Sequence, residues 1–171
     1  MRTRVGYTGG VVASPTYRSM GDHTEAIEIV YDPDQISYGE LLEIYWASTN
    51  PTSGSWSRQY RSAIWPNSPE QEAAAQASLE AIEAERGRKM YVDIEPAGVF
   101  TPAEDYHQKY YLRRDRSLVA AVEASWTGEG AWIDSTAAAR LNGAMGGYGD
   151  PETIRALALP ESLTDALLAR L

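Results

Sequence analysis

The sequence of 171 residues contains no cysteine. This absence excludes disulfide bonds, thiolate catalysis and cysteine metal sites within these residues. No apolar run approaches the length of a membrane span, and the first residues, Met-Arg-Thr-Arg-Val, lack the apolar core of a signal peptide. We therefore expect a cytoplasmic protein with no membrane partner.

Basic residues and phenylalanine are also scarce. Fifteen Lys and Arg residues stand against 24 Asp and Glu residues, which gives a formal net charge of −9. Such a surface repels phosphates, so we expect no nucleic-acid partner. The single Phe contrasts with eleven Tyr and five Trp. Most aromatic side chains therefore carry a polar group, as those in binding clefts often do and those in tyrosine-rich cores sometimes do.

One strand-like segment carries a candidate acid. Ile27, Ile29 and Tyr31 fall on one face at a period of two. The same spacing places Glu25 and His23 on that apolar face, at the start of the strand. A carboxyl group that is partly removed from water keeps its proton more readily and can then act as a general acid. The strand pattern alone favours the simpler interpretation, a solvated glutamate at a strand end, because charged residues are mostly exposed.

The remaining segments alternate between strand and helix patterns, which predicts an α/β or α+β domain. Helices are expected after Ser37, Ser68 and Thr101, each followed three residues later by Glu or Gln, and the second is expected to end at Gly87. A glycine-rich stretch at 143–149 lacks the Gly-Lys-Ser/Thr ending of a phosphate loop and is interpreted as a plain connection. Further strands are expected at 4–7, 59–65 and 91–95, and further helices at 115–125, 134–142 and 160–171.

Seven short motifs then occur in a fixed order. They are Val5-Gly6-Tyr7-Thr8-Gly9-Gly10, Ser14-Pro15-Thr16-Tyr17, Asp22-His23-Thr24-Glu25-Ala26, Tyr31-Asp32-Pro33, Ile36-Ser37-Tyr38, Arg58-Gln59-Tyr60-Arg61-Ser62-Ala63-Ile64 and Ala103-Glu104-Asp105-Tyr106-His107-Gln108-Lys109-Tyr110. Together they closely resemble the A-class peptide methionine sulfoxide reductases, over residues 2 to about 114. The tail resembles an extension found in one branch of that family.

The resemblance implies a fold and a domain organisation. The implied fold is α/β, an α+β two-layer sandwich with a ferredoxin-like core, here without its first strand and helix. Residues 1–114 would form the reductase-like domain, and residues 115–171 a mostly helical C-terminal extension.

The resemblance also implies roles for individual residues. In that family a cysteine thiolate attacks the sulfur of methionine-(S)-sulfoxide, a glutamic acid protonates the departing oxygen, and tyrosines hydrogen-bond that oxygen. By motif, the acid corresponds to Glu25 and the tyrosines to Tyr17 and Tyr60. With this family context, we favour a functional role for Glu25 over the interpretation as a solvated glutamate at a strand end. No cofactor is implied beyond a reductant, which for a full-length member is thioredoxin or another dithiol.

The two histidines allow a different interpretation. A metal site formed by His23, Glu25 and His107 is disfavoured, because no other ligand pair has suitable spacing and cysteine is absent. We therefore expect no metal. A structural hydrogen bond is the expected role of His107.

The departures from the family pattern concern the nucleophile. The family's Gly-Cys-Phe-Trp unit, which ends a first strand and opens a helix, is absent here, and a loop before the Gln-Tyr-Arg-Ser motif is shortened. We expect Trp56 in that loop to replace part of the apolar pocket. Without a thiolate the two electrons have no carrier, so the chain as written is expected to be inactive. We also expect it to expose a hydrophobic face or an unpaired strand edge.

Two functional hypotheses from different classes follow. In the first, the chain is a truncated or start-misassigned reductase that holds the acid and oxygen-binding half of the site for methionine sulfoxide, free or in peptides. In the second, it is a non-catalytic module that binds oxidised methionine or acts through partner contacts. The presence of Glu25, Tyr17 and Tyr60 favours the first.

Overall fold

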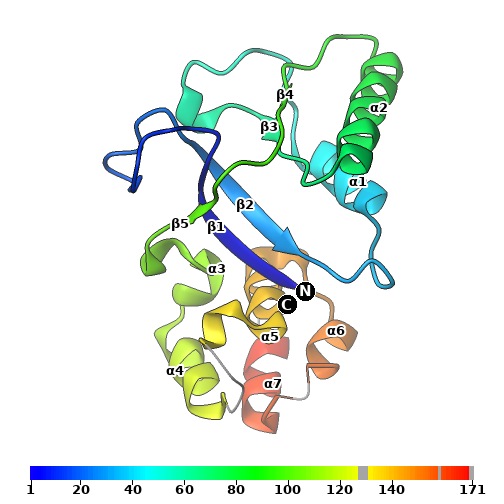
Figure 1. The fold of residues 1–171 in the computed structure, drawn as a ribbon. Helices are drawn as coiled ribbons and strands as arrows, with labels where there is room; N and C mark the ends of the chain where they lie inside the picture. Colours follow the sequence, from blue (N-terminus) through cyan, green and yellow to red (C-terminus); the bar gives the residue numbers. More distant parts are fainter. Residues whose placement is uncertain (127–130, 158, 170–171) are drawn as a thin grey trace. The chain divides into compact units, whose positions relative to one another are not determined.

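A computed structural model of the chain describes residues 1–126, 131–157 and 159–169 (Figure 1). The chain divides into two compact units. One consists of Gly6–Pro102, and the other joins Met1–Val5 to Ala103–Leu171. The boundary expected near residue 114 comes from the family resemblance rather than from compactness, and it stays a prediction.

A three-stranded sheet contains the candidate acid. It consists of β1 (Arg2–Thr8), β2 (Thr24–Val30) and β5 (Thr101–Pro102), in the order β2-β1-β5 (Figure 1). β1 pairs antiparallel with β5, with Gly6 opposite Pro102. A Cβ atom on Gly6 would collide with the Thr101 carbonyl oxygen and the Phe100 ring, so this approach requires glycine. A second, parallel pair is formed by β3 (Ala63–Ile64) and β4 (Asp93–Ile94).

Two capped helices belong to the unit Gly6–Pro102. Helix α1 (Tyr38–Ser48) begins at the predicted capping box, in which Ser37 and Glu40 satisfy each other's backbone N–H groups. Helix α2 (Pro69–Arg86) ends at Gly87 with a left-handed φ of 63°, as predicted. The Ser68 hydroxyl caps α2 by accepting from the N–H of Gln71. A complete capping box also requires the Gln71 side chain to accept from the N–H of Ser68, but it accepts from the N–H of Asn67 instead. The core between these helices contains Leu42, Trp46, Ala75 and Met90.

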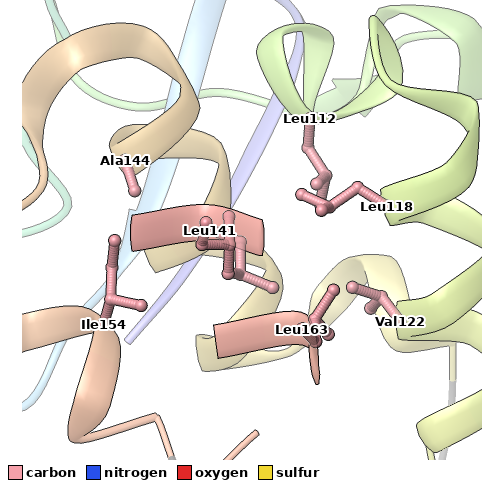
Figure 2. Close-up of a cluster of buried hydrophobic side chains, with 8 residues drawn as sticks. Leu112, Leu118, Val122, Leu141, Ala144, Ile154 and Leu163 are labelled. Atoms are coloured by element: carbon pink, nitrogen blue, oxygen red, sulfur yellow. The ribbon is translucent and has the colours of Figure 1, made fainter. Parts of the chain in front are cut away.

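The other unit is helical. Its elements are η2 (Asp105–His107), α3 (Tyr110–Arg113), α4 (Arg116–Ser125), η3 (Trp132–Asp134), α5 (Thr136–Gly143), η4 (Ala144–Tyr148), α6 (Pro151–Arg155) and α7 (Glu161–Leu168). Its apolar core collects side chains from α3 to α7 (Figure 2), namely Leu112, Leu118, Val122, Leu141, Ala144, Ile154, Leu163 and Leu167. No helix in the described part of the chain is long and apolar enough to cross a membrane.

A buried glutamine ties the first residues of the chain to this helical unit. The Gln108 amide accepts from the N–H of Val5 at 3.0 Å and donates to the Val5 carbonyl at 2.8 Å. The same amide nitrogen donates to the carbonyl of Ala103 at 3.0 Å. Three backbone groups are thus satisfied by one side chain, which explains why Met1–Val5 groups with the residues that follow Pro102.

Several predicted elements were wrong in type or length. The strand expected at 59–65 is reduced to β3, because η1 (Arg58–Tyr60) precedes it and the Ser57 hydroxyl caps that turn. The helix expected from Thr101 does not start there, since Thr101–Pro102 pairs with β1. The strand expected at 91–95 shortens to β4, and the glycine-rich stretch is largely η4, kinked at Gly147. Residues 170–171 of the last predicted helix lie outside the described residues.

The exposed apolar face that the sequence predicts is found on β2. This strand stands at one end of the sheet order. Its side chains Ile27 and Ile29 are 58% and 36% exposed, which is unusual for isoleucine in a strand. The face that also carries Glu25 is therefore open to solvent.

Candidate functional site

The predicted site residues form one hydrogen-bonded group in the unit Gly6–Pro102. The side-chain amide of Gln59 donates to Glu25 Oε1 at 2.7 Å and to the Tyr60 hydroxyl at 2.9 Å. Tyr60 is also hydrogen-bonded to Tyr17. The structure therefore brings the candidate acid and both candidate tyrosines together, although they come from a strand, a short helix and a loop.

A buried threonine holds the strand against the short helix. The hydroxyl of Thr24 donates to the carbonyl of Arg58 at 2.9 Å and accepts from Arg61 Nε at 3.0 Å. Thr24 is fully buried, so both bonds replace contacts with water. Because Glu25 follows Thr24 directly, these bonds place Glu25 beside η1.

An arginine connects the same helix to the preceding loop. Arg58 donates from Nε to the Asp22 carbonyl at 2.6 Å and from its terminal nitrogen to the Gly9 carbonyl at 2.8 Å. The Asp22 carboxylate in turn accepts the N–H groups of Val11 and Val12. These backbone hydrogen bonds, that from Val11 foremost, lower the pKa of Asp22. The loop between β1 and β2 is thereby held against η1.

Tyr17 lies in a tight turn of that loop. Thr16 and Ser19 exchange two backbone hydrogen bonds, at 3.2 and 3.0 Å, and enclose the tyrosine between them. Pro15 and Met20 are buried on either side of the turn. Tyr17 as a residue remains 41% exposed.

Trp56 lies next to this group. Its ring centroid is 5.8 Å from that of Tyr60, with the planes inclined by 51°. The side chain is 87% exposed. Trp56 therefore offers a flat apolar surface beside the ring of Tyr60, and most of that surface faces solvent. Its role in an apolar pocket stays a prediction.

The expectation that Glu25 is partly desolvated was wrong. Glu25 is exposed, because the face of β2 that it shares with Ile27 and Ile29 is uncovered. His23, expected on the same face, is instead buried, and its Nε2 donates to the carbonyl of Val12 at 2.8 Å. The carboxyl group of Glu25 is oriented by Gln59 rather than by burial.

Tyr60 is held as a hydrogen-bond donor. Its hydrogen bond with Tyr17 raises its pKa most, and the loss of hydration and the negative charges nearby, including that of Glu25, act in the same direction. The donation from Gln59 opposes them. A phenol is protonated at neutral pH, so Tyr60 has one O–H to donate, to Tyr17 or to a ligand oxygen on which negative charge accumulates.

The histidines do not build a metal centre in the described part of the chain, where no group of three or more His, Asp or Glu residues is arranged to hold an ion. The ring of His107 packs against Tyr106, with centroids 4.2 Å apart. The structural hydrogen bond expected of His107 stays a prediction.

Comparison with known proteins identifies the family. A sequence model described as "Peptide methionine sulfoxide reductase" matches residues 1–130. The chain belongs to the peptide methionine sulfoxide reductase family. The resemblance predicted from the seven motifs is therefore confirmed. This member of the family contains no cysteine in its 171 residues.

Individual reductases in the family are similar over different lengths. "Peptide methionine sulfoxide reductase MsrA" of Cronobacter sakazakii is 48% identical over 122 residues, which cover 63% of this chain and 58% of that protein. The "Peptide methionine sulfoxide reductase" of Drosophila melanogaster is 40% identical over 170 residues, which cover 96% of this chain and 66% of that protein. The chain thus spans about three fifths of the length of the curated relatives that it matches.

Solved structures of reductases confirm the α/β fold class. Methionine sulfoxide reductase A of Corynebacterium diphtheriae aligns with a TM-score of 0.58 and 34% identity, covering 66% of this chain and 63% of that one. The reduced form of Mxr1 from Saccharomyces cerevisiae aligns with a TM-score of 0.60 at 22% identity, covering 78% and 76%, and supports the fold alone.

Sequence reasoning missed Gln59. The residue lies inside the motif Arg58-Gln59-Tyr60-Arg61-Ser62, directly before a predicted site residue. Only the three-dimensional arrangement shows that its side chain returns to Glu25. The available signal was an amide side chain inside a functional motif, directly before a predicted site residue.

Proposed function

We propose that this chain binds methionine-(S)-sulfoxide and forms the acid and oxygen-binding part of a peptide-methionine (S)-S-oxide reductase. The observation that supports the proposal is the convergence of Glu25, Tyr17 and Tyr60 through Gln59. A sulfoxide oxygen is a strong hydrogen-bond acceptor, and two phenols and a carboxyl group supply the donors that it requires.

Each residue has a role in this proposal. Glu25 acts as the general acid and delivers a proton to the sulfoxide oxygen as it departs as water. Tyr60 and Tyr17 hydrogen-bond that oxygen while charge accumulates on it. Trp56 lies beside Tyr60 and contacts the apolar methyl and methylene groups of the ligand.

The electrons must come from a thiol outside these 171 residues. Reduction of a sulfoxide consumes two thiols and yields the thioether, a disulfide and water, so a sulfur atom has to be oxidised. The chain contains no cysteine to supply it. The proposed co-reactant is therefore a thiol-bearing polypeptide or a dithiol reductant such as thioredoxin. We also propose that the chain works in the cytoplasm, because such thiols stay reduced there.

Ligand binding tests the oxygen-binding role. Titration calorimetry would compare three otherwise identical peptides containing methionine-(S)-sulfoxide, methionine-(R)-sulfoxide or methionine. We expect the (S)-sulfoxide peptide to bind most tightly, and Tyr60→Phe and Glu25→Ala to weaken its binding by about tenfold each, the typical cost of one lost hydrogen bond to a polar ligand. Tyr148→Phe, at an exposed tyrosine, is the matched control. Equal affinity for all three peptides would contradict the proposal.

A turnover assay tests the requirement for an external thiol. The purified chain, the (S)-sulfoxide peptide and dithiothreitol are expected to produce methionine no faster than dithiothreitol alone. A faster rate, retained in a preparation free of host reductases, would show that the thiol requirement is wrong.

A further inference from the structure

A single amide nitrogen joins the two ends of the proposed site. Gln59 Nε2 carries two hydrogens, and both are used, one towards Glu25 Oε1 at 2.7 Å and one towards the Tyr60 hydroxyl at 2.9 Å. The two N–H bonds of an amide lie in one plane and point apart in a fixed fork. The carboxyl group and the phenol are therefore held at a set separation and angle.

The backbone that carries this amide is itself held in place. The N–H of Gln59 donates to the Ser57 hydroxyl at 3.2 Å. The adjoining carbonyl of Arg58 accepts from the buried Thr24 at 2.9 Å. The side chain of Gln59 therefore extends from a fixed position in η1 rather than from a freely moving loop.

We propose that Gln59 is a positioning residue that orients Glu25 and Tyr60 towards the sulfoxide oxygen. The inference rests on the proposed function and deepens it. An amide N–H can only donate, so Glu25 Oε1 acts as an acceptor whether or not the carboxyl is protonated. The proton of the acid form therefore resides on Oε2, the oxygen that Gln59 leaves available. Tyr60 likewise accepts from Gln59, which leaves its own O–H to donate to Tyr17 in the free protein or to the sulfoxide oxygen when a ligand is bound.

The same geometry separates Gln59 from the groups that touch the ligand. With both hydrogens of Nε2 occupied, this nitrogen has none left to donate to a sulfoxide. Its effect passes through Glu25 and Tyr60. Gln59 is for this reason a positioning residue rather than a catalytic one.

The test combines a ligand measurement with one that needs no ligand. Gln59→Leu removes both donors, and Gln59→Glu keeps the shape but replaces the donating amide with a carboxylate. Gln76→Leu, at an exposed glutamine of α2, is the matched control. We expect both Gln59 variants, and not the control, to bind the (S)-sulfoxide peptide about tenfold more weakly, as expected when two ligand-binding groups lose their orientation.

The pKa of Tyr60, followed by NMR titration of its ring carbons, supplies the second readout. Donation from Gln59 lowers this pKa, so it should rise in Gln59→Leu. It should also rise in Gln59→Glu, where a negative charge is added nearby. If Gln59→Leu does not fold, Gln59→Glu, which keeps the side-chain shape, provides the same comparison.

The outcomes separate the two proposals. A wild-type chain that binds no sulfoxide peptide overturns the proposed function, while the pKa of Tyr60 in the unliganded variants still decides whether Gln59 controls this group. An unchanged pKa of Tyr60 in the Gln59 variants overturns the positioning role. A ligand affinity that stays at the wild-type value in those variants does so as well.

Discussion

The buried hydroxyl of Thr24 donates to the carbonyl oxygen of Arg58 at 2.9 Å and so attaches β2 to the helical turn that carries Tyr60. Thr24→Val keeps the shape but leaves that carbonyl and Arg61 Nε without this partner. We expect a loss of about 1–3 kcal/mol in the free energy of unfolding, the usual cost of buried polar groups left unpaired. Urea denaturation measures it, with Thr24→Ser as the control that keeps the hydroxyl. A Val variant as stable as the wild type would contradict this role.

The hydrogen bond between Tyr17 and Tyr60 controls the acidity of Tyr60. It is the largest of the causes that raise the pKa of Tyr60, so Tyr17→Phe should lower that pKa. Glu25→Gln should lower it less, because the charge of Glu25 contributes less. NMR titration of the tyrosine ring carbons measures both changes, with Tyr148→Phe as the control. A Tyr60 pKa that rises in Tyr17→Phe would refute the assignment.

The ion pair between Arg61 and Glu95 should make stability depend on pH on the acid side. Arg61 donates to both carboxylate oxygens of Glu95 at 2.7 Å, and these hydrogen bonds lower the pKa of Glu95. A pKa that is lower in the folded than in the unfolded state stabilises the fold above the ordinary value of 4.5. This contribution is lost as the pH falls through the folded-state pKa.

Glu95→Gln tests this dependence. Because Glu95 is partly exposed, we expect only a small loss of stability at pH 7, and a shallower decline in the urea midpoint as the pH falls from 5 to 3, about the range over which carboxyl groups titrate. Glu80→Gln, an exposed glutamate of α2, is the control. The same acid decline in Glu95→Gln as in the wild type would exclude a contribution from this pair.

The exposed isoleucines of β2 should promote self-association. Ile27 is more than half exposed on a strand at the end of the sheet order, the arrangement that favours edge-to-edge contacts. Ile27→Thr keeps a β-branched side chain but reduces the apolar surface. We expect less aggregation by light scattering at equal concentration and little change in melting temperature. Val11→Thr, in an exposed loop, controls for a general gain in polarity, and equal effects of the two would argue against β2 as the cause.

The core of the helical unit depends on Leu141. This side chain is fully buried among residues of α3 to α7 (Figure 2). Leu141→Ala should lower the free energy of unfolding by about 2–5 kcal/mol, the range for truncating a buried leucine. Val99→Ala, at a largely exposed valine, should change it by less than about 0.5 kcal/mol. Thermal unfolding followed by circular dichroism compares the two, and similar melting temperatures would show that this cluster is not a stabilising core.

Local signals in the sequence predicted the ends of helices well. Ser37, Ser68, Asp115 and Ser135 cap helices as expected or within two residues of the expected start, because capping involves only neighbouring residues. The motifs likewise predicted Tyr17, Glu25 and Tyr60 as one site, and the structure places them in one hydrogen-bonded group.

What the sequence could not predict depends on contacts between distant residues. Residues 101–102 pair with β1, although Thr101 has the pattern of a helix cap. The turn of η1 replaces the first two residues of the strand expected at 59–65, because Thr24 of β2 holds the carbonyl of Arg58. The exposure of Glu25 was missed for the same reason, since a period-two pattern identifies a face but not what covers it.

Tyr17, Glu25, Trp56, Gln59 and Tyr60 all belong to the single unit Gly6–Pro102. The hydrogen bonds that join Glu25, Gln59 and Tyr60 are therefore internal to that unit. If the proposed site discriminates between sulfoxide stereoisomers, chimaeras that exchange residues 103–171 between relatives should keep the same discrimination.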